Sequence, residues 1–364
     1  MAPLYLALKA MPEVFETCLC VTAQHRQMLD QVLHTFGITP DIDLNLMQPG
    51  QDLFDVTAAV LLAMRGVLRD HRPDVLLVHG DTSTALAAAM AGFYQNVPVG
   101  HVEAGLRTHD LRSPFPEEFN RQVVGKLTRW HFAPTELSRD NLLAEGVPAS
   151  NVTVTGNTVI DALHWVLARI EADSQRREEI VALLSEHLPF DWHQQRLVLI
   201  TGHRRENFGD GFLQICAALS ELASRYPLVR FVYPVHLNPN VQQPVAAILG
   251  ALPNVHLIPP LDYEPFVYLL KHSFLVLTDS GGIQEEAPSL GKPVLVMRDV
   301  TERPEAIQAG TVRLVGADSN RIVANVAELL ESAVAYAAMA KAHNPYGDGC
   351  ACDRIISVLN AEVK

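Results

Sequence analysis

Short apolar runs alternate with longer amphipathic segments along almost the whole chain. The runs are rich in Val, Leu and Ile, as is typical of strands that are buried on both faces of a parallel sheet. This alternation predicts an α/β fold in which helices cover both faces of doubly wound parallel sheets. The predicted strands are residues 17–22, 75–79, 97–102, 130–133 and 152–155 in the first half, and 197–201, 230–235, 255–258, 274–277, 293–297 and 311–315 in the second.

The length of 364 residues predicts two domains, because a single core usually stops growing at about 250–300 residues. A long helical stretch, residues 159–187, carries charges in its middle and shows no strand pattern, so we predict that it connects the two halves. Ligands of such sheets bind outside the carboxyl ends of the strands. We therefore expect a ligand-binding cleft between two α/β domains of similar size.

The composition, 48% hydrophobic and 19% charged residues, is typical of a globular protein. No apolar run approaches the ~18 residues of a membrane span and no signal-peptide pattern is present, so we expect a soluble cytoplasmic protein without a membrane partner. A net charge of −13 argues against nucleic-acid binding. The five cysteines include two C-x-C pairs, a pattern that favours reduced thiols over disulfides or a zinc site.

The stretch 274–291 predicts a buried strand that ends in Thr-Asp-Ser-Gly-Gly and turns directly into a helix with two glutamates. Glycines at such a turn let backbone N–H groups approach a ligand, and a helix start favours negative charge, so we expect a phosphorylated ligand. Glu286 would accept hydrogen bonds from sugar hydroxyls of that ligand. The alternative is a glycine-rich turn followed by a solvated glutamate pair. In an acidic protein the ligand needs local cations, and we find 203–205 (His-Arg-Arg) and Arg298 with Arg303.

Polar side chains follow several predicted strands: Asp81, Glu103 and His203, with Glu117 after a proline-rich loop. Carboxylates enclosed in a cleft are expected to take up and release protons near neutral pH. His203 with its two arginines and the 280–282 turn would stabilise a departing diphosphate. This set fits carbon–oxygen cleavage at the anomeric centre of a nucleotide sugar. The alternatives are that Asp81 caps a helix, that Glu117 stabilises a helix N-terminus, and that His203 is an ordinary surface histidine.

Other cofactor chemistries find no support in the sequence. No metal-ligand spacing occurs, because His236 and His256 are isolated. No G-x-G-x-x-G motif lies at a strand–helix turn, so a nicotinamide dinucleotide has no predicted binding site.

Several motifs together resemble the bacterial non-hydrolysing UDP-N-acetylglucosamine 2-epimerases. The resemblance follows the chain in order over essentially its whole length. It is carried by V-T-A-Q-H-R (21–26), V-H-G-D-T (78–82), G-H-V-E-A-G-L-R (100–107), T-G-N-T-V-I-D-A (155–162), T-G-H-R-R-E-N-F-G (201–209), T-D-S-G-G-I-Q-E-E-A-P (278–288), T-E-R-P-E-A (301–306) and N-P-Y-G-D-G (344–349).

The resemblance implies a GT-B architecture of two Rossmann-like domains with an active-site cleft between them. The first would comprise residues 1–165 joined by a C-terminal helix, 351–364, and the second residues 166–350. It also implies reversible conversion of UDP-GlcNAc to UDP-ManNAc for surface polysaccharide synthesis. In that family UDP is eliminated as the C2 proton is removed, and it is then re-added to the resulting 2-acetamidoglucal. A homodimer and no dissociable cofactor are expected.

The resemblance also assigns roles to residues. Those that match the family's catalytic side chains are Asp81, Glu103, Glu117 and His203, and which carboxylate removes the proton stays open. Asp81, Glu103 and His203 would also contact the substrate. The nucleotide-binding matches are Ser280, Gly281 and Gly282 for the diphosphate, Glu286 for the ribose, Arg303 for a further phosphate contact, and Leu261 and Phe266 for the uracil. Residues that match a second, activating UDP-GlcNAc site are Gln24, Gln48, Gln51, Arg205 and His236.

The sequence departs from the family at its N-terminus. The family begins with a strand and a G-T-R-P-E-A-I-K loop whose Arg and Lys face the nucleotide sugar, whereas residues 1–10 here predict a helix with Pro in its first turn. Because a central strand of the first sheet is then absent, we expect the 364-residue chain to be less stable than a version that carries this strand. Three other functions stay open: a hydrolysing epimerase, a GT-B glycosyltransferase, and a non-catalytic UDP-sugar-binding remnant.

Overall fold

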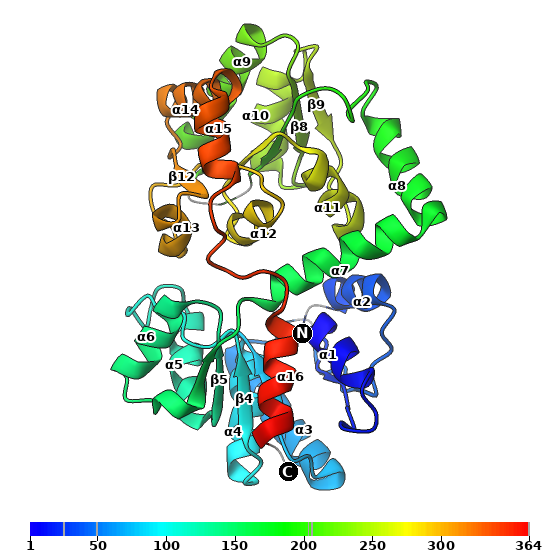
Figure 1. The fold of residues 1–364 in the computed structure, drawn as a ribbon, viewed down its shortest axis with the longest axis vertical. Helices are drawn as coiled ribbons and strands as arrows, with labels where there is room; N and C mark the ends of the chain where they lie inside the picture. The colour runs from blue at the N-terminus through cyan, green and yellow to red at the C-terminus, as the bar shows by residue number, and fades with distance from the viewer. Residues whose placement is uncertain (25, 49, 203, 205–206, 363–364) are drawn as a thin grey trace. The chain divides into compact units, whose positions relative to one another are not determined.

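The computed structural model describes the whole chain except residues 25, 49, 203, 205–206 and 363–364. The chain divides into two compact units (Figure 1). Unit 1 consists of Met1–Trp165 with Tyr346–Lys364, and unit 2 of Val166–Pro345. Each unit contains parallel sheets with helices between successive strands, so the predicted α/β architecture is confirmed.

Unit 1 is built around a four-stranded parallel sheet in the order β3-β4-β5-β6, and a separate parallel pair, β1-β2, lies outside that sheet. Its strands are β1 (Cys20–Val21), β2 (Ile42–Asp43), β3 (Leu76–His79), β4 (Val99–Val102), β5 (Trp130–Ala133) and β6 (Val152–Val154). Its helices are α1 (Ala2–Lys9), α2 (Arg26–Phe36), α3 (Leu53–His71), α4 (Ser83–Tyr94), α5 (Glu117–Leu127), α6 (Glu136–Ala144), the first part of α7 (Thr158–Ala172) and α16 (Ala351–Glu362), with a 3₁₀ turn at Ala149–Asn151.

Two apolar clusters hold the sheet of unit 1. One joins α3 and α4 to the sheet, with Val60 and Ala87 completely buried beside Val99. The other joins α1 and α16 to β4 and β5, with Leu4 and Ile355 packed in the same cluster as Phe132. Burying each of the larger apolar side chains contributes about 1.5–3 kcal/mol. The last helix of the chain is therefore part of the core of unit 1.

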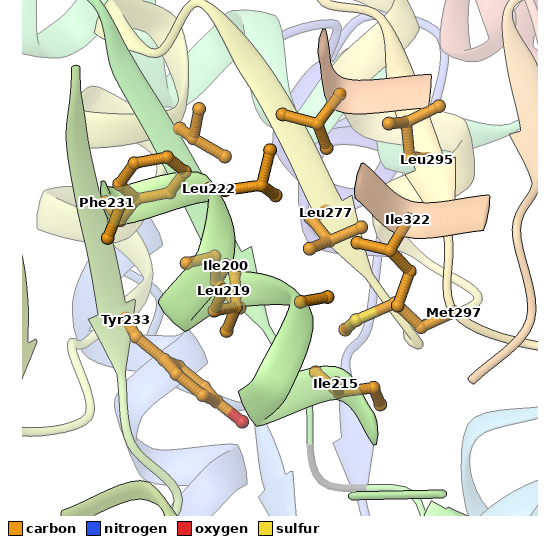
Figure 2. Packing of buried hydrophobic residues seen from close by; sticks show 14 of the residues in the cluster. Ile200, Ile215, Leu219, Leu222, Phe231, Tyr233, Leu277, Leu295, Met297 and Ile322 are labelled. Atoms are coloured by element: carbon orange, nitrogen blue, oxygen red, sulfur yellow. The ribbon is translucent and has the colours of Figure 1, made fainter. Parts of the chain in front are cut away.

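Unit 2 contains a six-stranded parallel sheet in the order β12-β11-β10-β7-β8-β9. The strands are β7 (Leu197–Thr201), β8 (Arg230–Pro234), β9 (Val255–Ile258), β10 (Leu275–Thr278), β11 (Val294–Val296) and β12 (Val312–Leu314). The helices are α8 (Ser174–His187), α9 (Asp210–Arg225), α10 (Pro239–Leu249), α11 (Tyr263–His272), α12 (Ile283–Ser289), α13 (Pro304–Gln308), α14 (Ser319–Glu331) and α15 (Ala333–Ala340). Side chains of α9 pack on β7, β8 and β10 in its core (Figure 2).

The strand order of unit 2 reverses beside β7. From β7 the chain builds outward through β8 and β9, and it then returns to the other side of β7 to form β10. Such a reversal leaves a crevice at the carboxyl ends of the two central strands, which is where ligands of open parallel sheets bind. The turn at 280–282 follows β10 directly, so the topology places it at this crevice.

The observed elements differ from the predicted ones at two places. The strand β2 was not predicted, because two residues are too few to form a recognisable apolar run. The stretch 159–187 is not one helix but two, α7 and α8, which are separated at Asp173. The backbone of Asp173 is extended, and its side chain accepts a hydrogen bond from the N–H of Arg176 at 3.0 Å. This N-cap starts a new helix where the charge pattern alone predicted continuity. The predicted N-terminal helix is present as α1.

Within the described residues, no single helix has the length and apolar character that crossing a membrane requires. By length and composition alone, only α14 and α15 taken together, which are bent by 97° at their junction, reach that threshold.

The buried carboxylate of Asp161 fastens the C-terminal helix to unit 1. It accepts hydrogen bonds from the backbone N–H groups of Cys352, at 2.8 Å, and Ala351, at 3.2 Å. Replacing Asp161 by Ala leaves two donors of the first turn of α16 without this acceptor. We expect Asp161→Ala to destabilise unit 1 by about 1–3 kcal/mol. Urea unfolding that is followed by circular dichroism measures the effect, and the exposed Asp70→Ala serves as the control. Equal unfolding midpoints for the two variants would contradict the assignment.

Candidate active site

Asp81 and Glu103 leave the sheet of unit 1 at the same edge. His79, the last residue of β3, pairs in register with Val102, the last residue of β4. Gly80 has φ 66°, and its N–H donates to the carbonyl of Val102 at 3.0 Å. A Cβ placed on Gly80 would lie 3.2 Å from Oε2 of Glu103. The turn that carries Asp81 therefore passes directly against the Glu103 carboxylate, as the strand-end prediction requires.

Asp81 is held by residues of α5 rather than by α4, the helix that follows it. A guanidinium nitrogen of Arg121 donates to its Oδ2 at 2.7 Å, and the amide of Asn120 donates to its backbone carbonyl at 2.8 Å. The residue that caps α4 is Thr82, whose hydroxyl oxygen accepts from the N–H of Ala85 at 3.2 Å. The alternative in which Asp81 caps this helix is therefore wrong. Its carboxylate lies instead against a mostly buried cation.

Glu103 has a backbone conformation that few residues with side chains adopt, with φ 64°. The side-chain amide of Asn157 donates to its Oε1 at 3.2 Å, and Nε2 of His79 lies 3.7 Å from its Oε2. Left-handed residues of this kind concentrate at functional sites, where surrounding contacts hold them in place. The two contacts leave the carboxylate of Glu103 fixed between β3 and the segment that precedes α7.

The two glutamates that open α5 have different environments. Glu118 is completely buried and accepts hydrogen bonds from the N–H groups of Thr108 at 3.0 Å and His109 at 3.1 Å, and from the amide of Gln122 at 2.8 Å. Burial opposes ionisation of Glu118, but these hydrogen bonds and the charge of Arg121, whose Nη1 lies 3.4 Å from Oε2 of Glu118, outweigh it and lower the pKa of Glu118 below the ordinary value. Glu117 is partly exposed at the first position of the helix. Glu118 thus fixes the preceding loop, whereas the side chain of Glu117 stays partly exposed.

The sequence did not predict a buried histidine that contacts the turn between β3 and Asp81. His101 lies on β4, and its Nε2 is 2.8 Å from the carbonyl oxygen of Gly80. Burial lowers the pKa of His101 to about 3, so the ring is neutral and Nε2–H donates to that carbonyl. This hydrogen bond supports the turn on which Asp81 stands. The sequence signal was the position of His101, two residues before Glu103 in a strand that is otherwise apolar.

In unit 2, the turn Ser280-Gly281-Gly282 joins β10 to α12. The N–H of Ser280 donates to the hydroxyl of Thr278 at 3.0 Å, and the side chain of Gln284 donates to the carbonyl of Ser280 at 3.1 Å. A Cβ placed on Gly282 would meet no atom within 4 Å, whereas one on Gly281 would lie 3.4 Å from the guanidinium of Arg303. The turn is therefore open at Gly282 and covered by a cation at Gly281.

Arg303 is oriented by carboxylates. Its Nε donates to Oε1 of the buried Glu285 at 2.8 Å, and its Nη1 donates to Glu302 at 3.1 Å. Glu285 follows the glycine turn on α12, so one short segment supplies both the turn and the group that places the guanidinium over it. A fixed guanidinium beside exposed backbone is suited to a phosphate group, which it can contact through two parallel hydrogen bonds.

The adjacent Glu286 is bound differently from Glu285. It is 7% exposed, and the hydroxyl of Tyr263 donates to its Oε1 at 2.7 Å. Burial raises the pKa of Glu286 to about 7, although the hydrogen bond from Tyr263 favours the ionised form. Tyr263 is the first residue of α11, in the same segment as the predicted uracil contacts Leu261 and Phe266. The structure thus brings this segment to the helix that follows the glycine turn.

The residues predicted for a second ligand come from both units. Gln48 and Gln51 line a hollow of about 380 Å³ with Gly50, Asp55 and Ala58. Gln24 accepts a hydrogen bond from Thr84 of α4 at 2.9 Å. His236 belongs to unit 2, where its Nδ1 accepts from the N–H of Asn238 at 3.1 Å. His203 and Arg205 lie outside the residues that the structure describes.

Glu118→Gln tests the division of roles between the two glutamates of α5. We expect this variant to lower the free energy of unfolding at pH 7 by about 1–3 kcal/mol, because buried N–H donors lose a charged acceptor. Since the folded pKa of Glu118 is lowered, its contribution is present above the pKa of the unfolded chain and is lost as the pH falls through the folded value. The difference from the unsubstituted protein should therefore narrow on acidification. Glu117→Gln is the matched control, and an equal loss in both variants would refute the distinction.

Comparison with known proteins shows the family to which the chain belongs. The sequence model of the family described as UDP-N-acetylglucosamine 2-epimerase matches residues 7–360. The UDP-N-acetylglucosamine 2-epimerase of Salmonella typhimurium strain LT2 is 59% identical over 361 residues, covering 99% of this chain and 95% of the relative. That of Escherichia coli K12 is 58% identical over 359 residues, covering 99% and 94%. The crystal structure of UDP-GlcNAc 2-epimerase from Neisseria meningitidis bound to UDP-GlcNAc has a TM-score of 0.88 and 50% identity, covering 100% of this chain and 96% of that one. The chain belongs to the UDP-N-acetylglucosamine 2-epimerase family.

Proposed function

We propose that this enzyme interconverts UDP-N-acetylglucosamine and UDP-N-acetylmannosamine by inverting the configuration at C2. The observation that carries the proposal is the convergence of Asp81 and Glu103 at one sheet edge of a chain that belongs to this family. The product would supply surface polysaccharide synthesis.

The reaction we propose proceeds through elimination and re-addition. A carboxylate takes the C2 proton, the C1–O bond to UDP breaks, and a C1–C2 double bond forms in 2-acetamidoglucal. UDP then attacks C1 again while C2 receives a proton on the opposite face. Asp81, Glu103 and Glu117 are the groups that we assign to these two proton transfers. The close approach of the Gly80 turn to Glu103 supports the joint action of Asp81 and Glu103.

Unit 2 would hold the nucleotide. We assign the diphosphate to Ser280, Gly281 and Gly282 with the guanidinium of Arg303, because the glycine turn lies at the strand-order reversal and beside a fixed cation. His203, which is outside the described residues, would stabilise the charge on the departing UDP. The remaining assignments are Glu286 for the ribose and Leu261 and Phe266 for the uracil.

A second molecule of UDP-GlcNAc is part of the proposal as an activator. The hollow beside Gln48 and Gln51 supports this assignment for unit 1. The side-chain amide of Gln51 accepts from the N–H of Gln48 at 2.8 Å and donates to the carbonyl of Leu46 at 3.1 Å, so it shapes the hollow, while the amide of Gln48 can donate and accept hydrogen bonds to a sugar. Gln24, Arg205 and His236 complete the proposed set.

A progress curve in heavy water, followed by NMR, tests the function. Starting from UDP-GlcNAc, we expect UDP-ManNAc to appear with deuterium at C2, because the C2–H bond must break and re-form. Free ManNAc with UDP would instead identify a hydrolysing epimerase. Transfer of the sugar to an added acceptor, with release of UDP and without deuterium at C2, would identify a glycosyltransferase. Binding of UDP without turnover would identify a non-catalytic protein.

Glu117→Gln isolates the proton transfer. We expect turnover and deuterium incorporation to fall together by a factor of about 100 or more, because a positioned acid or base contributes about 10²–10⁴-fold. Affinity for UDP, measured by calorimetry, should stay near that of the unsubstituted enzyme. The exposed Glu136→Gln, in the first turn of α6, is the control and should retain full activity. Near-normal deuterium incorporation in Glu117→Gln would exclude the role assigned to Glu117.

The proposed assembly is a homodimer formed through α3 and α4. Leu62, Phe93 and Tyr94 are 58%, 57% and 65% exposed, and the side chain of Gln95 donates to the carbonyl of Arg65 at 2.9 Å, which brings the end of α4 to this part of α3. Clustered apolar side chains of this kind mark association surfaces. We also place the enzyme in the cytoplasm, and its five free cysteines support a reducing compartment.

Sedimentation velocity tests the dimer. We expect the unsubstituted chain to sediment as a dimer and the double variant Phe93→Glu/Tyr94→Glu to sediment as a monomer, because two charges would be buried at the interface. Leu228→Glu, at an exposed apolar position of unit 2, controls for surface charge and should remain dimeric. A dimeric double variant would exclude this face as the interface.

A further inference from the structure

Two adjacent carboxylates on α12 have different partners. Glu285 is buried and paired with Arg303, whose Nε lies 2.8 Å from its Oε1. Glu286 has no such cation among the residues that the structure describes, and its carboxylate receives the hydroxyl of Tyr263 at 2.7 Å. A buried charge without a cationic partner is costly and is usually retained for function. The protonation state of Glu286 therefore depends on a neutral hydrogen-bond donor, the hydroxyl of Tyr263.

The charged and titratable groups around Glu286 come from three elements. Glu285 is its neighbour on α12, Arg303 lies directly before α13 and is paired to Glu285, and Tyr263 begins α11. Asp262 precedes Tyr263 as the N-cap residue of α11. Burial raises the pKa of the Glu286 carboxyl to about 7, and the Tyr263 hydroxyl opposes this by stabilising the charged form. The side chain is thus poised to change its charge near neutral pH.

The place of Glu286 suggests the ligand group that it recognises. It lies on the helix that follows the Ser280-Gly281-Gly282 turn, so a nucleotide whose diphosphate meets that turn would extend its ribose along α12. A ribose presents two neighbouring hydroxyl donors, and an ionised carboxylate can accept from both. A protonated carboxyl group has lost part of this capacity, because one oxygen then carries a hydrogen.

We propose that Tyr263 is a positioning residue of the nucleotide site, which holds Glu286 so that the carboxylate recognises the cis-diol of the ribose. The inference rests on the proposed function, which assigns a UDP-sugar to this unit. The tyrosine hydroxyl donates to Oε1, fixes the side-chain orientation, and leaves the other oxygen for the diol. Selectivity for a ribonucleotide over one without the diol then depends on Tyr263, although the tyrosine itself donates only to Glu286.

The experiment compares UDP with 2′,3′-dideoxy-UDP in calorimetric titrations of the full-length enzyme between pH 6 and pH 8.5. We expect the unsubstituted enzyme to prefer UDP at pH 8 and to lose that preference as the pH falls below about 7, where Glu286 takes up a proton. In Tyr263→Phe the preference at pH 7.5 should fall about fivefold, the typical effect of one hydrogen bond. The loss on acidification should also begin at higher pH, because the charged form has lost a donor.

The affinity for dideoxy-UDP should be equal in the two proteins, because that ligand lacks the hydroxyls that Glu286 accepts. With UDP-GlcNAc, Tyr263→Phe should raise KM with little change in kcat. Tyr268→Phe removes a hydroxyl from the same helix on a residue that packs on Trp192 and His272, and it should behave as the unsubstituted enzyme.

Three results would overturn the inference. If Tyr263→Phe kept the preference and pH profile of the unsubstituted enzyme, Tyr263 would have no positioning role. If it lost affinity for both ligands equally, its role would be structural. If the unsubstituted enzyme bound UDP and dideoxy-UDP equally at pH 8, no diol recognition would exist. Failure of the unsubstituted enzyme to bind UDP at all would instead overturn the proposed function together with this inference.

Discussion

The register of hydrogen bonds between β3 and β4 determines where the carboxylates of unit 1 lie. Because the two strands are parallel and end at paired residues, the segments that follow them leave the sheet at one edge. Gly80 makes the approach close enough for its turn to touch Glu103. The same rule acts in unit 2, where the reversal of strand order beside β7 leaves the glycine turn after β10 at a crevice. In both units the hydrogen-bonded pairing of the strands determines where the polar residues that follow them lie.

Each unit contains a pair of adjacent glutamates whose two carboxylates have different partners. The carboxylate of Glu118 accepts hydrogen bonds from backbone N–H groups of the preceding loop, while Glu117 beside it stays partly exposed. Glu285 forms an ion pair with Arg303, while Glu286 accepts a hydrogen bond from the neutral hydroxyl of Tyr263. Consecutive residues on a helix point about 100° apart, so two adjacent side chains can contact different neighbours. Hydrogen bonds offset the cost of burying the carboxylate of Glu118, and the ion pair with Arg303 offsets the cost of burying that of Glu285.

Periodicity alone predicted the fold class and nearly all of the strands, because buried parallel strands give continuous apolar runs. It did not predict β2, which is two residues long, or the break at Asp173, where an N-cap interrupts a helical charge pattern. The strand-end carboxylates were predicted because chain order and strand polarity place them together. Arg121 and Tyr263 were not, because each comes from a different element than the carboxylate it contacts, and no local spacing encodes such a meeting.

The core of unit 1 includes the last helix of the chain, and this has a consequence for biosynthesis. Ile355 and Leu359 of α16 pack with residues from the first few turns of the protein, whereas unit 2 is one uninterrupted segment. A ribosome therefore completes every residue of unit 2 before it delivers the helix that closes unit 1. Domains usually fold in the order of their synthesis. Here unit 1 is started before unit 2 and completed after it, and its apolar face between α1 and β5 stays uncovered until α16 has been synthesised.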